Sequence, residues 1–292
     1  MSSTQKVWLI TGTSSGFGEC LVKIALARGD LVIATARSLA KIQHFLESQS
    51  EHVANLRLLE LDIVSGEEAL KGVIAKAVEF WGRIDVLVNN GGNGAKGMLE
   101  ETRTSQLRLQ FEANFFGTVD VTLAVLPYMR ARRSGTVVMI GSRSSWKPEQ
   151  PGIGMYASSK AALHTYSETL AVEIAPFSVR VLIVEPAAFR TNTFNNTPYW
   201  LNPRDLISDY DETRATSQEW YERMHRVIKG DPHKGMEAVV DVVRGEGQAA
   251  DRSWPLYLPL GDLAVQGIEE KCKQMLKVVE DWRDVSTGLD VD

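Results

Sequence analysis

Apolar runs alternate with segments of helical periodicity along most of this 292-residue chain. Six runs are nearly continuous in apolar residues, mostly β-branched or leucine, which is typical of strands buried on both faces of a parallel sheet. They cover residues 6–11, 31–35, 56–61, 84–88, 136–140 and 179–184, and a seventh strand is expected at 254–258. Helical spacing is found between them, at 69–81, 104–133 and 156–175. The alternation predicts right-handed strand–helix–strand units in an α/β, doubly wound fold.

The regular alternation stops between about residues 190 and 234. Asn and Pro cluster in this segment, and both favour turns, so we expect an excursion over the sheet that forms a substrate lid. Apolar positions after Gly261 predict a C-terminal helix at about 262–283. No shift of composition marks a linker, so residues 1–292 are expected to form a single domain.

Composition excludes several other classes of protein. With 44% hydrophobic and 24% charged residues the chain has globular composition, and its net charge of −5 argues against nucleic-acid binding. Cys20 and Cys272 lie far apart, which fits a reduced, cytoplasmic protein. There is no signal peptide and no apolar run of ~18 residues, so no membrane span is expected. The five histidines lack metal-ligand spacing, and we expect no metal site.

A glycine-rich turn follows the first strand directly. Gly12 permits a tight turn, Gly16 lets the backbone approach a pyrophosphate, and Gly18 allows the next helix to pack closely on the sheet. The helix N-terminus then offers unpaired N–H groups and the positive end of its dipole to phosphate. A glycine turn without a ligand is the alternative, but the position after the first strand favours a dinucleotide site.

Tyr156 and Lys160 are four residues apart, with Ser142 fourteen positions upstream of the tyrosine. Positions i and i+4 share one face of a helix, so the ammonium would lie beside the phenol. A fixed positive charge favours the phenolate and would lower the pKa of Tyr156 toward working pH. Two residues on a solvated helix face would show the same spacing, so the pair alone does not identify a catalytic site.

These motifs together resemble the short-chain dehydrogenase/reductase family, in order and interval, from about residue 6 to 191. The motifs that carry the resemblance are Gly12, Gly16 and Gly18, the run Asn89-Asn90-Gly91-Gly92, Asn114, Ser142, and Tyr156 with Lys160. The resemblance implies a Rossmann fold with a seven-stranded parallel sheet and a bound nicotinamide dinucleotide. It also implies a homodimer or homotetramer formed through the helices at 104–133 and 156–175.

The resemblance further implies a catalytic tetrad. Tyr156 would exchange a proton with the substrate oxygen, and Ser142 would hydrogen-bond the same oxygen. Lys160 would lower the pKa of Tyr156 and bind the nicotinamide ribose, while Asn114 would hold a water that links Lys160 to solvent. A turn serine and a buried helix asparagine are the alternatives for Ser142 and Asn114.

The choice of cofactor depends on the end of the second strand. An acid there would accept hydrogen bonds from the ribose 2′-OH of NAD(H) and repel a 2′-phosphate. Ala36 occupies the place of that acid, and Arg37 follows with a planar cation suited to phosphate, so NADP(H) is favoured over NAD(H). A solvated Arg37 at the sheet edge is the alternative.

Other cofactor contacts come from the resemblance alone. Asp62 matches the position that hydrogen-bonds adenine. The further residues expected in the cofactor cleft are Ser14, Ser15, Phe17, Ser38, Ile63, Asn90, Gly91, Gly92, Pro186, Ala187, Phe189 and Thr191, together with Tyr156 and Lys160. Two residues depart from the family pattern: Gly91 stands where alanine is usual and would loosen a turn, and Ala187 stands where glycine is usual.

The expected substrate side is apolar and aromatic. Trp146, Phe189 and Phe194 are candidate walls beside Ser142 and Tyr156, which suits a hydrophobic ketone, aldehyde or secondary alcohol. The sequence therefore predicts an NADP(H)-dependent carbonyl reductase or alcohol dehydrogenase. An isomerase or cyclisation enzyme of a biosynthetic pathway, or a non-catalytic NADP(H)-binding sensor, are the alternatives.

Overall fold

A single seven-stranded sheet forms the centre of the computed structural model, which describes residues 5–191 and 199–291. The strands are β1 (Val7–Ile10), β2 (Leu31–Ala36), β3 (Leu56–Glu60), β4 (Val86–Asn89), β5 (Gly135–Ile140), β6 (Val179–Pro186) and β7 (Tyr257–Leu260). All neighbours pair in parallel, in the order β3-β2-β1-β4-β5-β6-β7. The expected α/β fold with a seven-stranded parallel sheet is confirmed.

The seventh strand begins three residues later than its apolar pattern predicts. Trp254 packs outside the strand, where its indole Nε1 donates to Val181 O at 2.9 Å. In the sequence, Trp254 therefore resembled the first residue of the strand, although it lies outside β7.

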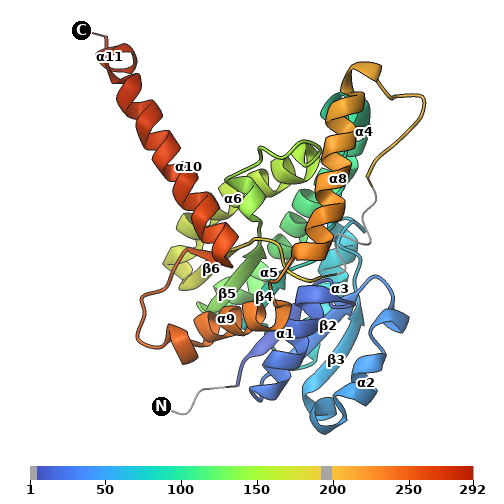
Figure 1. The fold of residues 1–292 in the computed structure, drawn as a ribbon. Helices are drawn as coiled ribbons and strands as arrows, with labels where there is room; N and C mark the ends of the chain where they lie inside the picture. The colour runs from blue at the N-terminus through green and yellow to red at the C-terminus, as the bar shows by residue number, and fades with distance from the viewer. Residues whose placement is uncertain (1–4, 192–198, 292) are drawn as a thin grey trace.

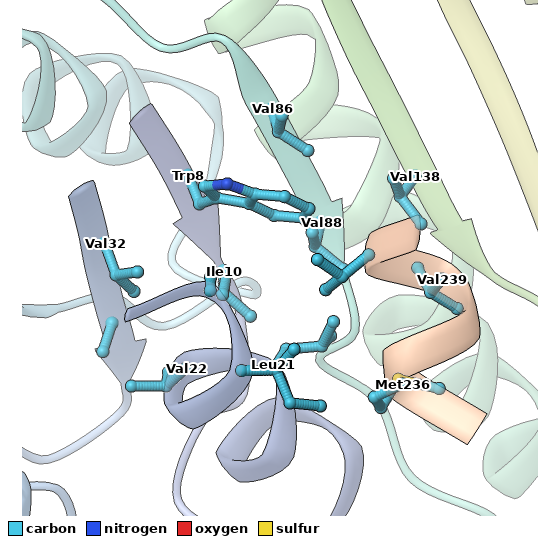
Figure 2. Close-up of a cluster of buried hydrophobic side chains, with 14 of the residues drawn as sticks. Trp8, Ile10, Leu21, Val22, Val32, Val86, Val88, Val138, Met236 and Val239 are labelled. Carbon is cyan, nitrogen blue, oxygen red and sulfur yellow. The ribbon is translucent and has the colours of Figure 1, made fainter. Parts of the chain in front are cut away.

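Two apolar clusters cover the two faces of the sheet. On one face α1 (Gly16–Ala27) and α9 (Pro232–Arg244) pack on alternate strand residues such as Trp8 and Ile10 (Figure 2). On the other face lie α3 (Glu67–Glu79), α5 (Gly117–Arg132) and α6 (Gly154–Ile174). Because both faces are covered, the strands have no polar face, which explains their continuous apolar runs.

The helix expected at 104–133 is not one regular helix. It consists of α4 (Leu99–Phe111), a π-helical turn (Glu112–Phe116) and α5. Such turns are rare and occur frequently at functional sites, and this one holds the fully buried Asn114. Gly117 follows it because a Cβ there would lie 2.4 Å from Ile63 O.

The segment expected as a turn-rich excursion contains a long helix, α8 (Asp211–Val227), which runs beside α4 (Figure 1). Arg214 on α8 donates through Nε to Glu101 Oε2 on α4 at 3.1 Å, and the Glu101 side chain is fully buried. This ion pair lowers the pKa of Glu101, because the arginine hydrogen bond outweighs the loss of hydration.

The remaining elements are short or peripheral, apart from the C-terminal helix. They are η1 (Leu39–Lys41), α2 (His44–Ser48), η2 (Ser50–Asn55), η4 (Arg143–Ser145), η5 (Ala175–Phe177), η6 (Ser208–Tyr210), η7 (Gly247–Ala249), α10 (Asp262–Asp281) and α11 (Arg283–Ser286). α10 extends away from the sheet (Figure 1). Within the described ranges, no helix combines the length and apolar character needed to cross a membrane.

Candidate active site

The glycine turn lies at the carboxyl end of β1, where the strand order reverses between β1 and β4. In open parallel sheets such a reversal opens a crevice for ligands. Gly12 and Gly16 both have left-handed φ, at 69° and 60°. A Cβ on Gly18 would lie 2.3 Å from Gly12 O, so only glycine permits this approach. The turn therefore has the shape expected of a cradle for pyrophosphate at the start of α1.

Asn90 and Thr11 hold the turn in place. The Asn90 side-chain amide donates to Thr11 O and Gly12 O, both at 2.9 Å. Thr11 Oγ1 accepts from the backbone N–H groups of Asn90 and Gly91, at 3.0 and 2.9 Å. A Cβ on Gly91 would lie 3.3 Å from that oxygen, so glycine relieves a tight contact here. The hydrogen bonds do not support the expectation that Gly91 loosens the turn.

The four tetrad residues meet across three elements. Ser142 lies two residues after the end of β5, and Tyr156 and Lys160 occupy the first two turns of α6. Lys160 Nζ donates to Ile140 O at 2.6 Å. A Cβ built on Gly92 would lie 2.8 Å from Asn114 Oδ1 and 3.9 Å from Lys160 Nζ, so both side chains face this glycine. The structure thus brings together every residue expected in the tetrad.

Asn114 is fixed by protein groups. Its amide nitrogen donates to Asn93 O at 2.8 Å and to Ser159 Oγ at 3.1 Å, and its oxygen accepts from Asn93 N at 2.9 Å. Asn114 therefore ties the loop after β4 to α6, beside Lys160.

The electrostatics of the pair differ from the expectation. Loss of hydration raises the pKa of the half-buried Tyr156, Glu185 raises it further, and a hydrogen bond with Ser142 opposes both. Burial lowers the pKa of Lys160 to about 8, against a smaller opposing effect of Glu185. The expected lowering of the Tyr156 pKa is not seen, because the loss of hydration outweighs the Ser142 hydrogen bond, and the Lys160 ammonium donates to the carbonyl of Ile140.

Comparison with known proteins decides the family. The sequence signature described as short chain dehydrogenase matches residues 6–202. The chain belongs to this family. A short-chain dehydrogenase from Streptomyces avermitilis has a solved structure that is 35% identical, with a TM-score of 0.83, covering 99% of this chain and 100% of that one.

Two curated relatives are oxidoreductases by name. The oxidoreductase claN of Passalora fulva is 41% identical over 69% of this chain and 88% of its own length. The 3-ketodihydrosphingosine reductase of Bacteroides thetaiotaomicron is 36% identical over 65% of this chain and 66% of its own.

More distant structures show that the fold accommodates either cofactor. ElxO, with NADP bound, is 23% identical with a TM-score of 0.72, covering 90% of this chain and 100% of its own. A Burkholderia phymatum family member in complex with NAD is 17% identical with a TM-score of 0.78, covering 100% and 99%. At these identities the likeness concerns the fold alone.

The other expected cofactor residues lie around the same crevice. Arg37 is exposed at the end of β2, directly after the buried Ala36. Asp62 and Ile63 follow β3, and a Cβ on Gly91 would lie 3.4 Å from Ile63 Cδ1. Thr191 faces the glycine turn: a Cβ on Gly16 would lie 3.3 Å from its Cβ.

Phe189 corrects one expectation about the substrate wall. Its side chain is 7% exposed and its ring meets the Phe17 ring edge-on at 5.2 Å. Cβ atoms on Gly230 and Gly235 would lie within 3 Å of this ring, so the two glycines make room for it against α9. Phe189 is a core side chain that anchors the segment after β6, and it does not form an open wall.

The other two expected wall residues have different outcomes. Trp146 is half-buried, with its ring 5.1 Å from that of His164 and 6.0 Å from that of Tyr257. Phe194 lies outside the described residues.

One charged residue of the site escaped sequence reasoning. Glu185, fully buried near the end of β6, accepts from the backbone N–H of Ser142 at 3.1 Å. A carboxylate directly after the apolar run Val181-Leu182-Ile183-Val184 was the available signal. Within residues 5–191 and 199–291 no group of three or more His, Cys, Asp or Glu side chains could hold a metal ion.

Proposed function

We propose that this family member is an NADP(H)-dependent carbonyl reductase or alcohol dehydrogenase that acts on a hydrophobic ketone, aldehyde or secondary alcohol. The observation that carries the proposal is the convergence of Ser142, Tyr156 and Lys160 beside the glycine turn at the strand reversal. The narrow approach between Gly12 and Gly18 fits a dinucleotide pyrophosphate, because a side chain at either position would collide with the atoms that shape the turn.

The residues divide the chemistry between them. The nicotinamide, when bound, accepts or supplies the hydride. In reduction, Tyr156 donates a proton to the carbonyl oxygen, and its raised pKa keeps it protonated as an acid. Ser142 donates a hydrogen bond to the same oxygen as negative charge develops there. Lys160 would bind the nicotinamide ribose, and Asn114 fixes the backbone and side chains beside this lysine through its hydrogen bonds to Asn93 and Ser159.

Support for a lipophilic carbonyl substrate comes from the half-buried Trp146, which follows Ser142 by four residues, and from the relative named 3-ketodihydrosphingosine reductase. The test is NADPH consumption with a panel of lipophilic ketones, aldehydes and quinones, followed by product identification. Tight NADPH binding without turnover on any of them would contradict the proposal and favour a cofactor-binding sensor.

Arg37→Glu is expected to shift cofactor preference from NADPH toward NADH. The carboxylate would accept from the ribose 2′-OH and repel a 2′-phosphate, while the lost guanidinium weakens NADPH binding roughly tenfold. The measurement is kcat/KM for both cofactors. Lys41→Glu, the same charge change at another exposed position, is the control and should keep the wild-type preference. Unchanged preference in Arg37→Glu would refute this account of the 2′-phosphate site.

A homodimer or homotetramer through α4, α5 and α6 is part of the proposal. Exposed apolar side chains on this part of the surface support it: Leu109, Phe116, Leu123 and Val172 are between 47% and 75% exposed. Phe116→Glu is expected to dissociate the oligomer, because the substitution would bury a charge in the contact between subunits. Light scattering should then measure a lower mass than for the wild type. Leu46→Glu, at an exposed leucine on α2, should leave the mass unchanged. A monomeric wild-type protein would exclude this part of the proposal.

A further inference from the structure

Behind the tetrad lies a buried pair of ionisable groups, Glu185 and His164. Glu185 has no exposed surface, and its Oε2 accepts from the Ser142 N–H at 3.1 Å. Its Oε1 lies 3.2 Å from His164 Nδ1, within ion-pair distance but without the alignment of a hydrogen bond. The His164 side chain is only 11% exposed. The carboxylate therefore touches the backbone of one tetrad residue and is faced by a histidine on its other side.

The backbone next to Ser142 is shaped to admit this carboxylate. A Cβ on Gly141 would lie 3.0 Å from Glu185 Oε1 and from Val184 O, a tighter approach than most side chains tolerate. Gly141 N also donates to Val184 O at 2.8 Å, which continues the β5–β6 pairing up to the serine. Because Ser142 Oγ accepts from Ser144 N at 3.1 Å, the serine is held by bonds to both its backbone and its side chain.

His164 belongs to a regular series on α6. Tyr156, Lys160, His164 and Glu168 are spaced by four residues, so they lie along one face of the helix. His164 Nε2 lies 3.2 Å from Tyr257 Oη on β7, and that hydroxyl hydrogen-bonds to Glu168. Glu168 is 44% exposed, so the series runs from the catalytic tyrosine to solvent.

The charges on these groups act on one another. Burial raises the pKa of Glu185, and His164, the Ser142 N–H and Lys160 oppose that rise. Burial lowers the pKa of His164, but Glu185 and Glu168 outweigh it, so the net shift is upward. The groups facing the pair are Tyr156, Lys160 and Glu168 on α6 and Tyr257 on β7. Glu185 raises the pKa of both Tyr156 and Lys160.

We propose that Glu185, paired with His164, is a positioning residue that fixes Ser142 and places a negative charge behind the Tyr156–Lys160 pair. The inference rests on the proposed function for its catalytic meaning. The carboxylate holds the serine backbone, so that Oγ keeps its place beside the phenol. Its charge favours the protonated forms of Tyr156 and Lys160, and a protonated tyrosine is the form that reduction requires.

Glu185→Gln is the decisive variant, since the amide keeps the shape and an oxygen acceptor for Ser142 N–H but loses the charge. The pKa of Lys160, which is about 8 in the wild type, should fall. The pKa of His164 should fall as well, because Glu185 raises it in the wild type. NMR titration of the histidine rings and of the lysine ε-carbons measures them, with His164→Gln and Lys160→Met used for assignment. The rate of carbonyl reduction should decline at lower pH than in the wild type, because Tyr156 loses its proton earlier.

Two further variants separate positioning from charge and from general stability. Glu185→Asp keeps the charge but withdraws it from Ser142 N–H, so kcat should fall while the Lys160 titration stays near that of the wild type. Asp30→Asn is the matched control: Asp30 is also fully buried and pairs with Arg244, but it lies before the amino end of β2, whereas Glu185 lies at the carboxyl end of β6. It should lower thermal stability without moving either titration.

Each outcome decides the question. Glu185→Gln could lower thermal stability alone, as Asp30→Asn is expected to do, with both titrations and the pH profile unchanged from the wild type. In that case Glu185 and His164 contribute only to the stability of the fold, and the proposal is overturned. If the wild-type enzyme reduces no carbonyl compound, the proposed function fails. The two NMR titrations still show in that case whether Glu185 acts on Lys160.

Discussion

Replacing Tyr156 by phenylalanine is expected to abolish turnover while NADPH binding persists. The ring keeps its half-buried place on α6, and only the hydroxyl that meets Ser142 is lost. Loss of a positioned proton donor lowers the rate by about 10²–10⁴-fold. Steady-state NADPH consumption and a fluorescence titration of NADPH binding measure the two properties separately.

Tyr166→Phe is the matched control for this substitution. Tyr166 lies on the same helix, is also half-buried, and packs its ring edge-on against that of Phe115 at 5.9 Å. Its kcat should equal that of the wild type. Full activity in Tyr156→Phe would show that the proton comes from another group, and the proposed mechanism would fall.

Gly18→Ala is expected to destroy cofactor binding and to destabilise the fold. The new Cβ would lie 2.3 Å from Gly12 O and 2.6 Å from Asn90 Nδ2, and neither group can move without opening the turn. Overpacking of this kind costs about 1–3 kcal/mol in the free energy of unfolding. NADPH affinity should fall more than tenfold, since the displaced atoms shape the pyrophosphate cradle. Calorimetric titration and thermal denaturation provide both values.

A second glycine-to-alanine exchange tests whether the loss of NADPH affinity depends on the position of the glycine or on the exchange itself. Gly72 lies inside α3, has no left-handed φ, and a Cβ there would meet no atom within 4 Å. Gly72→Ala should raise the free energy of unfolding by up to about 1 kcal/mol, because alanine favours the helix. Its NADPH affinity should not change. Wild-type affinity in Gly18→Ala would disprove the close approach described for this turn.

The sheet could be predicted from sequence because helices cover both of its faces. Most strand positions are therefore apolar, a local signal that needs no knowledge of the partners. The long helix α8 gave no such signal: its residues are mostly polar, and turn-forming residues precede it. Its placement depends on Arg214 meeting Glu101, a residue 113 positions away in the chain.

In the candidate site, too, the features with a local sequence pattern could be predicted, and those that depend on distant residues could not. The glycine spacing and the interval from Tyr156 to Lys160 are local patterns, and the structure places these residues together. The direction of the Tyr156 pKa depends on burial and on a carboxylate from β6, which no local pattern reveals. Phe189 was likewise misplaced because its neighbours, two glycines on or near α9, are distant in sequence.

The four-residue spacing along α6 restricts how this protein can change in evolution. Substitution at Tyr156, Lys160, His164 or Glu168 alters one group and leaves the others in place. An inserted or deleted residue between Tyr156 and Lys160 would rotate everything beyond it by about 100° around the helix axis. It would separate the tyrosine from the lysine, and the histidine from Glu185, in a single event. This part of the helix can therefore vary in composition but not in length, and natural insertions should fall in the loops before Gly154 or after Ile174.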